Sequence, residues 1–356
     1  MFAPKFQISP RLGKALMEIE ACRHIVSDLP VTVALLDSLR KSARLISTHY
    51  STQIEGNRLT QEQVQEVVLQ GGTFPNRERD EQEVRNYYRA LDYVDALIDD
   101  EGALTERHVK SLHGFVMTGK ENPTQYRDGQ NVIRDSASGG IVYMPPEAED
   151  VPRLMKELIA WVNAEQASHE LPAPIMAGLA HYQFATIHPY YDENGRTARL
   201  LTNLLLHRTG YGLKGIYSLE EYYARDLGAY YEALSVGPSH NYYMGREAAD
   251  LSVWVEYFCL GMADAFATIR AKATEAAKTQ GVDREQTLRK LDARQRQVLM
   301  LFEIDAYVTT KQIADHLGIH RRTALNLCNN WVGDGFLIQY GEARKSRKYS
   351  LAGELR

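Results

Sequence analysis

The sequence predicts a mainly α-helical fold, with one β-hairpin in its body and a winged helix-turn-helix domain at its C-terminal end. Apolar residues recur at three- and four-residue spacing through most of the chain, while glycine and proline cluster at 71–76 and 139–146. A length of 356 residues indicates two or three domains, since a typical domain holds about 150 residues.

The helical pattern begins with residues 12–50, which contain few helix-breaking residues. The stretch 271–289 is rich in Ala, Lys and Glu around Gly281, and we interpret it as a helix end and linker. Between these limits the same periodicity predicts helices over 61–70, 79–98, 105–117, 150–165, 173–187, 195–208, 220–235 and 246–278.

Two short extended runs interrupt the helices. Residues 131–134 and 139–144 are rich in β-branched residues and end at Pro145-Pro146, which predicts a hairpin over 131–146. Such a hairpin offers edge hydrogen bonds to an extended peptide, a docking mode known as β-augmentation. The alternative is an ordinary surface hairpin.

The block after residue 290 follows a different pattern. Helices are expected over 294–302, 309–317 and 320–331, the second opened by a capping box at Thr309 and Gln312. Two strand-like runs follow at 336–340 and 348–351, with a basic connection between them. Three helices followed by a basic hairpin is the order of a winged helix.

Charge is distributed unevenly along the chain. The net charge is −5, but residues 282–356 hold 13 Lys and Arg against 9 Asp and Glu, a net of +4. A basic module suggests an anionic partner, so we expect DNA binding; the alternative is a winged helix that makes protein contacts only. The residues proposed to contact DNA are Arg321, Arg322, Arg344 and Lys345.

Several classes of protein are disfavoured. No run of about 18 apolar residues is available for a membrane helix, and the first residues do not resemble a secretion signal. The three cysteines are widely spaced without a Cys-x-x-Cys pair, which argues against a disulfide framework or a zinc site. A cytoplasmic protein is therefore expected.

The candidate site is the segment 188–199, which joins two apolar helices. His188 is suited to act as a general base near neutral pH, and Asp192 offers an oxygen ligand for Mg²⁺. Asn194 and Gly195 lie where the second helix begins, so that free backbone N–H groups and the helix dipole favour an anion there.

The same segment supplies two cations. Arg196 and Arg199 are three residues apart, which places both on one side of the first helical turn, where they can bind phosphate oxygens. Individually each residue of the segment fits a capped turn, but together they predict a phosphate site. His181 lies on the preceding apolar helix and is expected to be a core residue.

The segment His188-Pro-Tyr-Tyr-Asp-Glu-Asn-Gly-Arg-Thr-Ala-Arg199 resembles the signature of the Fic family, His-Pro-Phe-x-x-Gly-Asn-Gly-Arg-x-x-Arg. Residues 83–87, Tyr126-Arg127 and 141–146 also resemble family features, the last being its flap. The resemblance covers roughly 30–240 and implies a helical Fic core.

The resemblance implies transfer of AMP from ATP to a Ser, Thr or Tyr hydroxyl of a target protein or of the chain itself. His188 would be the base, Asp192 the Mg²⁺ ligand, and the flap residues Ile141, Val142 and Tyr143 the docking edge for the target. The nucleotide-binding residues implied are Glu193, Asn194, Gly195, Arg196, Thr197, Ala198, Arg199, Tyr230 and Tyr231.

Two positions depart from the family pattern. Tyr190 replaces Phe, which keeps an aromatic ring but adds a hydroxyl that needs a partner. Glu193 replaces Gly, so it would be strained if the position requires a positive φ. An extra carboxylate beside phosphates is expected to weaken nucleotide binding or to shift the nucleotide preference.

A regulatory element is expected upstream, in a helix over about 45–56. Ser51 and Glu55 share a helix face, and Gly56 is placed to end the helix. The stretch resembles the family's inhibitory motif, Ser/Thr-x-x-x-Glu-Gly/Asn, which implies that Glu55 pairs with Arg199 and blocks it within one chain, with a homodimer able to modulate the block.

The domain plan is an N-terminal helical region over 1–100, a catalytic core over 101–240, a helical extension and linker over 241–288, and a winged helix over 289–356. Three alternatives to adenylyl transfer remain open from the sequence. They are removal of AMP at the same site, transfer of another nucleotidyl or phosphoryl group, and a nucleotide-sensing regulator that binds DNA.

Overall fold

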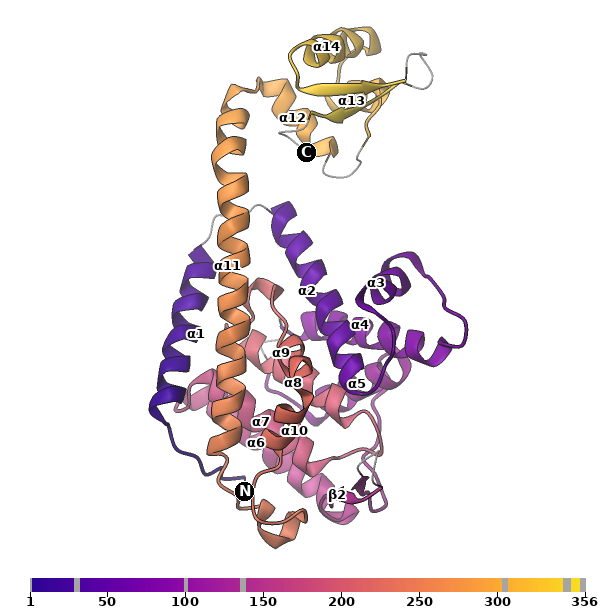
Figure 1. Cartoon of the computed structure of the whole chain (residues 1–356). Helices are drawn as coiled ribbons and strands as arrows, with labels where there is room; N and C mark the ends of the chain where they lie inside the picture. Colours follow the sequence, from indigo (N-terminus) through magenta and orange to yellow (C-terminus); the bar gives the residue numbers. More distant parts are fainter. Residues whose placement is uncertain are drawn as a thin grey trace. The chain divides into compact units, whose positions relative to one another are not determined.

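The computed structural model describes residues 2–28, 33–98, 102–134, 139–302, 307–341 and 347–352, and for 33–34, 276–290 and 293 it describes the backbone only. The chain divides into two compact units (Figure 1). One comprises residues up to 28 together with 35–271, and the other comprises 272–356 together with 29–34.

The first unit is helical, as the periodicity predicted. The N-terminal helices pack into the same core as the central ones. Its helices are α1 (Pro10–Asp28), α2 (Val33–Ile54), α3 (Gln61–Gln70), α4 (Glu78–Ile98), α5 (Glu106–Thr118), α6 (Val151–Ser168), α7 (Ala173–Ile187), α8 (Asn194–Arg208), α9 (Glu220–Arg225), α10 (Leu227–Leu234) and the first part of α11 (Ser252–Lys290), with short turns η1 (Ala148–Asp150), η2 (Leu213–Gly215) and η3 (Tyr242–Arg246).

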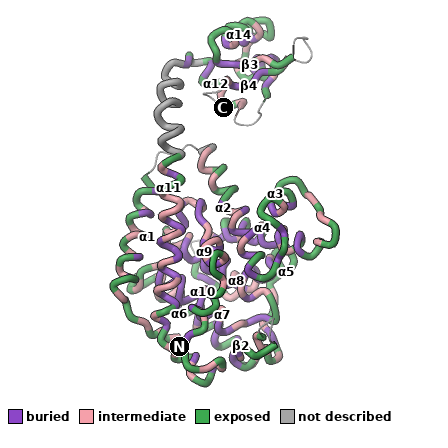
Figure 2. The backbone as a smooth tube through the Cα atoms, in the orientation of Figure 1, coloured by how far each residue is buried: buried purple, intermediate pink, exposed green. Residues whose placement is uncertain are grey.

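The helices α7 and α8 form the centre of this unit. Almost every residue of α7 is buried, as expected for a helix that is apolar on all sides, and the tube of Figure 2 is purple along it. The helix α8 packs against α7, α4 and α5. Consequently the loop between α7 and α8 is held by the best-packed part of the protein.

Two helical predictions needed correction. Residues 220–235 form α9 and α10 rather than one helix, because Asp226 has the extended angles φ −143° and ψ 83° and caps α10 by accepting a hydrogen bond from Ala229 N at 3.0 Å. The expected linker over 271–289 is instead helical as far as Lys290. Its Ala-, Lys- and Glu-rich composition favours helix, and Gly281 alone costs only about 1 kcal/mol.

The predicted hairpin is present. Strand β1 (Ile133–Arg134) pairs antiparallel with β2 (Ile141–Tyr143), with Ile133 opposite Tyr143 and Arg134 opposite Ile141. The predicted turn residues 135–138 lie outside the described part of the chain.

The second unit has the predicted order of elements. Helices α12 (Ala293–Phe302), α13 (Thr310–His316) and α14 (Arg321–Gly333) precede the antiparallel strands β3 (Leu337–Tyr340) and β4 (Lys348–Leu351). The capping box at Thr309 and Gln312 is formed. Arg344 and Lys345 lie outside the described residues, whereas Arg321 and Arg322 are exposed at the start of α14.

The helices were compared with the requirements for crossing a membrane. Within the described ranges, none combines the length and the apolar character that a bilayer span requires.

The packing of α7 against α11 generates a stability prediction. A Cβ built on Gly178 would lie 2.7 Å from Cδ1 of the buried Phe258, whereas one built on Gly13 in α1 meets nothing within 4 Å. Overpacking costs about 1–3 kcal/mol, more than the ~1 kcal/mol by which helices favour Ala over Gly. We expect Gly178→Ala to lower Tm and the control Gly13→Ala to raise it. An equal rise for both in a thermal melt would contradict this packing.

Candidate active site

The loop between α7 and α8 is closed by its own backbone and by Asn194. His188 at its start and Glu193 at its end both have left-handed φ angles, 52° and 63°. The Asn194 side chain accepts from Tyr190 N at 2.9 Å and donates to Tyr190 O at 2.8 Å. Its amide therefore fixes the loop shape instead of reaching toward a ligand, and only its backbone is left at the helix N-terminus.

The ring of Tyr190 anchors the same loop. It is 2% exposed and stacks on His113 with 3.6 Å between ring centroids. His113 Nε2 donates to Asp192 O at 3.1 Å, and its Nδ1 accepts from the Thr124 hydroxyl at 2.7 Å. His113 thus positions the backbone of Asp192. No sequence pattern indicated this role, because the two residues lie 79 positions apart.

Arg127 joins the loop to the base of the hairpin. Its Nε donates to His188 O at 3.0 Å, its backbone N donates to Pro189 O at 2.9 Å, and its Nη2 donates to Pro146 O. The side chain is buried, so these carbonyl contacts solvate its charge. In the sequence Arg127 stood out by resemblance only, with no role assigned to it.

His188 is half-buried and follows the end of α7. Burial lowers its pKa to about 4; a backbone hydrogen bond at Ala185 opposes this shift, while the nearby Arg127 charge adds to it. The ring is therefore neutral at pH 7 and has a lone pair with which to accept a proton.

Asp192 is exposed on the loop four residues further on. One carboxylate oxygen accepts from Glu193 N at 2.8 Å. Among the described residues there is no group of three or more His, Cys, Asp or Glu side chains near one point. A single exposed carboxylate nevertheless fits Mg²⁺, which commonly takes one or two carboxylates and completes its shell with water and phosphate oxygens.

The Arg199 guanidinium is buried beneath the end of α2. Its Nε donates to the Ser51 hydroxyl at 2.8 Å, and its Nη2 donates to Ser51 O and to Glu55 Oε1, each at 2.9 Å. Gly56, with φ 92°, follows the helix end as predicted. The predicted pairing of Glu55 with Arg199 is thus present in the geometry.

Gly195 allows the Glu55 carboxylate to reach this position. A Cβ built on Gly195 would overlap Glu55 Oε1 and lie 3.2 Å from Nη1 of Arg199. The carboxylate therefore lies against the first turn of α8, where the backbone favours an anion.

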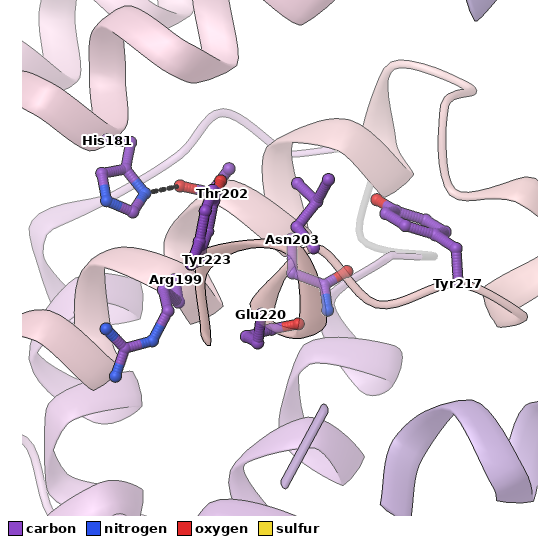
Figure 3. A pocket seen from close by; sticks show the side chains of 8 residues that line it. His181, Arg199, Thr202, Asn203, Tyr217, Glu220 and Tyr223 are labelled. Carbon is purple, nitrogen blue, oxygen red and sulfur yellow. Dashed lines mark hydrogen bonds between the residues drawn. The ribbon is translucent and has the colours of Figure 1, made fainter. Parts of the chain in front are cut away.

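Behind Arg199 lies a small interior pocket (Figure 3). Both ring nitrogens of the fully buried His181 form hydrogen bonds. Nδ1 lies 2.9 Å from the Thr202 hydroxyl, and Nε2 lies 3.0 Å from the Tyr230 hydroxyl. Glu220 lines the same pocket and accepts from Tyr87 at 3.2 Å. The expectation that His181 is a core residue is confirmed.

Arg196 is also paired with a carboxylate. Its guanidinium contacts both carboxylate oxygens of Glu193, and its Nη1 lies 3.5 Å from Glu83 Oε2. Burial raises the pKa of Glu193 to about 7; the adjacent Arg196 opposes this shift, and the carboxylate of Asp192 adds to it. As expected for a position that usually holds glycine, Glu193 has a positive φ.

Some predicted site residues lie elsewhere. Tyr230 is 2% exposed and hydrogen-bonded within the core, so it does not wall a nucleotide, while Tyr231 is 46% exposed. Tyr143 points inward, donating to Thr186 O at 2.7 Å. Thr197 and Ala198 are fully buried, and the Thr197 hydroxyl donates to Glu193 O at 2.8 Å, so only their backbone could serve a ligand.

These buried histidines generate a pH prediction. Burial lowers the pKa of His113, His188 and His207 to about 4 and that of His181 to about 3, from the ordinary 6.5. The unfolded chain therefore binds more protons than the folded chain between these values, so this contribution to stability is complete above pH 6.5 and is lost as the pH falls toward 4.

We expect the free energy of unfolding, measured in denaturant, to fall through this window by up to about 1.4 kcal/mol per pH unit per histidine. His181→Gln removes one titrating group and should make the fall shallower. A stability that does not change from pH 6.5 to 4 would contradict the burial of these rings.

Part of the chain is similar to known proteins. The Fic/DOC family model matches residues 103–206. Over 202 residues the chain is 32% identical to "Protein adenylyltransferase Fic" of Drosophila grimshawi, covering 56% of this chain and 40% of that protein. The Drosophila erecta relative of the same name is 31% identical, with 39% covered. The chain thus matches about two fifths of the length of these relatives.

Solved structures share the fold. A Fic family protein from Desulfovibrio desulfuricans G20 aligns over 99% of both chains with a TM-score of 0.63 and 23% identity. Fic-1 from C. elegans aligns over 75% of this chain and 73% of its own with a TM-score of 0.59 and 24% identity. These matches show that the chain shares the fold of these Fic proteins and that residues 103–206 match the Fic/DOC family model, with the motif at 188–199 placed at the start of α8.

Proposed function

We propose that the chain is a protein adenylyltransferase that moves AMP from ATP to a Ser, Thr or Tyr hydroxyl. The observation that carries the proposal is the placement of the His188 imidazole at the start of a hydrogen-bonded loop that leads directly into the anion-binding start of α8. The names of the Drosophila relatives support the same activity.

In this reaction the target hydroxyl attacks the α-phosphorus of ATP while His188 takes the hydroxyl proton. A new phosphorus–oxygen bond forms to the target, the α–β bridge breaks, and pyrophosphate leaves. The backbone N–H groups at Gly195 and the guanidinium of Arg196 stabilise the charge that develops on the phosphate oxygens. Arg199 holds the distal phosphate when it is free.

Asp192 would hold Mg²⁺ in this reaction, because its carboxylate is exposed beside the phosphate-binding turn. Bound there, the ion supplies neutralisation of the phosphate charge. His113 binds the carbonyl of Asp192 itself, and Arg127 binds the carbonyl of His188 four residues earlier in the loop. Together they keep base and metal ligand at a constant separation.

The hairpin is the proposed docking edge for the target. Ile141 is 46% exposed and Val142 is 37% exposed, so both can contact an extended peptide, while buried Tyr143 anchors the strand. Arg127 ties the base of the hairpin to the catalytic loop, which sets the distance between docking edge and base.

Glu55 acts as an internal inhibitor in this proposal. Its carboxylate binds the guanidinium that the distal phosphate needs, and Ser51 holds that guanidinium from the same helix end. Both partners belong to one chain, so the block requires no second protomer. Removal of AMP, or transfer of another nucleotidyl group, would use the same residues and is separated from adenylylation by the experiment below.

A second candidate function concerns the C-terminal unit. Arg321 and Arg322 are exposed on the first turn of α14, which follows the two-helix arrangement expected of a DNA-binding winged helix. We therefore propose that this unit binds DNA through the exposed start of α14.

The adenylylation proposal predicts a defined pattern among variants incubated with Mg²⁺ and α-labelled ATP. Glu55→Gly should raise labelling roughly ten- to a hundredfold, because a charge-assisted pair of about 1.5–3 kcal/mol is removed from Arg199. His188→Ala should abolish labelling. Intact mass would show whether one AMP is added per chain.

Gln53→Gly is the matched control, since it introduces the same residue at an exposed position of the same helix end. It should label like the parent. Equal labelling of parent and Glu55→Gly would refute the internal block, and labelling that survives in His188→Ala would refute the assigned base. Loss of AMP from premodified protein, without gain, would assign the reverse reaction.

The DNA proposal predicts salt-dependent binding that fluorescence anisotropy can measure. Replacing Arg321 and Arg322 by Ala should weaken binding and lower the slope of log affinity against log salt by about 1 for each DNA phosphate that is no longer neutralised. Replacing the exposed Arg107 and Arg153 of the first unit is the charge-matched control. Identical slopes for both pairs would exclude this surface.

A further inference from the structure

We propose that Glu193 is a second internal anion, which competes with the nucleotide's phosphates for Arg196 independently of Glu55. This inference rests on the proposed function, since it assumes that phosphates bind at the start of α8. It assigns a regulatory role to the residue that replaces the family's glycine.

The first support is the geometry of the pair. The Glu193 carboxylate contacts the Arg196 guanidinium at two points, a hydrogen bond from Nη2 to Oε1 and an ion-pair contact between Nε and Oε2, on a face that phosphate oxygens would otherwise use. The Arg196 side chain is 3% exposed and that of Glu193 is 8% exposed, so little water weakens the attraction. A phosphate group can use this face of Arg196 only after the carboxylate moves away.

The second support is that Glu193 does not serve the helix it precedes. It occupies the N-cap position of α8 but makes no side-chain capping hydrogen bond. Its backbone is left-handed, with φ 63°, a conformation that glycine adopts without strain. Glu193 thus lacks the usual capping hydrogen bond and has a strained backbone, while its carboxylate contacts Arg196.

The third support is that Arg196 has another partner. Glu83 lies 3.5 Å from its Nη1, and Glu83 is itself held by Asn57 at 3.1 Å and by Arg79 at 2.9 Å. This network comes from α4 and the segment after α2, outside the loop. Arg196 therefore keeps an anionic neighbour when Glu193 swings out, which makes the carboxylate displaceable.

The two internal anions are separate. Glu55 contacts Arg199, and Glu193 contacts Arg196, one helical turn apart on α8. Removing Glu55 leaves the Glu193 pair in place. In the parent protein, full access for a nucleotide requires that both carboxylates be displaced. In Glu55→Gly, Arg199 is free but Arg196 is still blocked by Glu193.

Nucleotide affinity tests this directly. Isothermal titration with ATP and Mg²⁺ would compare Glu55→Gly/His188→Ala with the same protein carrying Glu193→Gln, a background in which transfer does not consume the ligand. Glutamine keeps the size and an acceptor oxygen while removing the charge. We expect Kd to fall at least about tenfold, the factor that corresponds to about 1.4 kcal/mol.

Asp264→Asn is the charge-matched control, because it also removes one carboxylate that pairs with an arginine, Arg225, on an exposed surface. It should leave Kd unchanged. A thermal melt of each variant verifies that it is folded. Glu193→Gly, which also relieves the positive φ, should tighten binding at least as much as Glu193→Gln.

The outcomes separate this inference from the proposed function. Unchanged or weaker ATP binding in both Glu193 variants, with labelling still raised by Glu55→Gly, would overturn the second anion alone and make Glu193 a positioning residue for Arg196. No ATP binding by any folded variant, with no labelling, would overturn the proposed function and this inference with it.

Discussion

The burial of one positive charge organises the active-site half of the protein. Arg199 projects from α8 into the core, and a buried guanidinium without partners would cost several kcal/mol. Ser51 and Glu55 supply those partners, so the end of α2 has to dock at the start of α8. Because Ser51 makes two of the three hydrogen bonds, the docking does not depend on Glu55 alone.

The loop between α7 and α8 combines local and distant support. Asn194 closes the loop through hydrogen bonds to Tyr190, which is four residues away. His113 and Arg127 fix its backbone from α5 and from the segment before the hairpin. The local bonds determine the shape of the loop, and the distant ones determine where the loop lies relative to α5 and the hairpin.

Much of this arrangement could be predicted from the sequence, because helical periodicity and capping residues are local signals. The positive φ of Glu193 and the Glu55–Arg199 pair were also expected, from a motif position and a resemblance. Burial was harder to predict. The resemblance implied binding roles for Tyr143 and Tyr230, yet their hydroxyls form hydrogen bonds inside the core. A linear sequence does not show which face of an element is covered.

The role of His113 could not be predicted for a related reason. Spacing to possible metal ligands is the sequence criterion for a histidine, whereas the contact of His113 is to a backbone carbonyl, which every residue has. A bond of that kind leaves no pattern of residue types in the sequence and is visible only once α5 is placed beside the loop.

The absence of a side chain at Gly195 has a consequence for how much ligand the site requires. It lets Glu55 rest against α8 as a tethered ligand, present at an effective concentration that the fold sets and dilution does not change. For short flexible tethers such concentrations are on the order of millimolar. A free anion with the same intrinsic affinity has to exceed that concentration to displace Glu55, and an anion that binds more tightly displaces it at a correspondingly lower concentration.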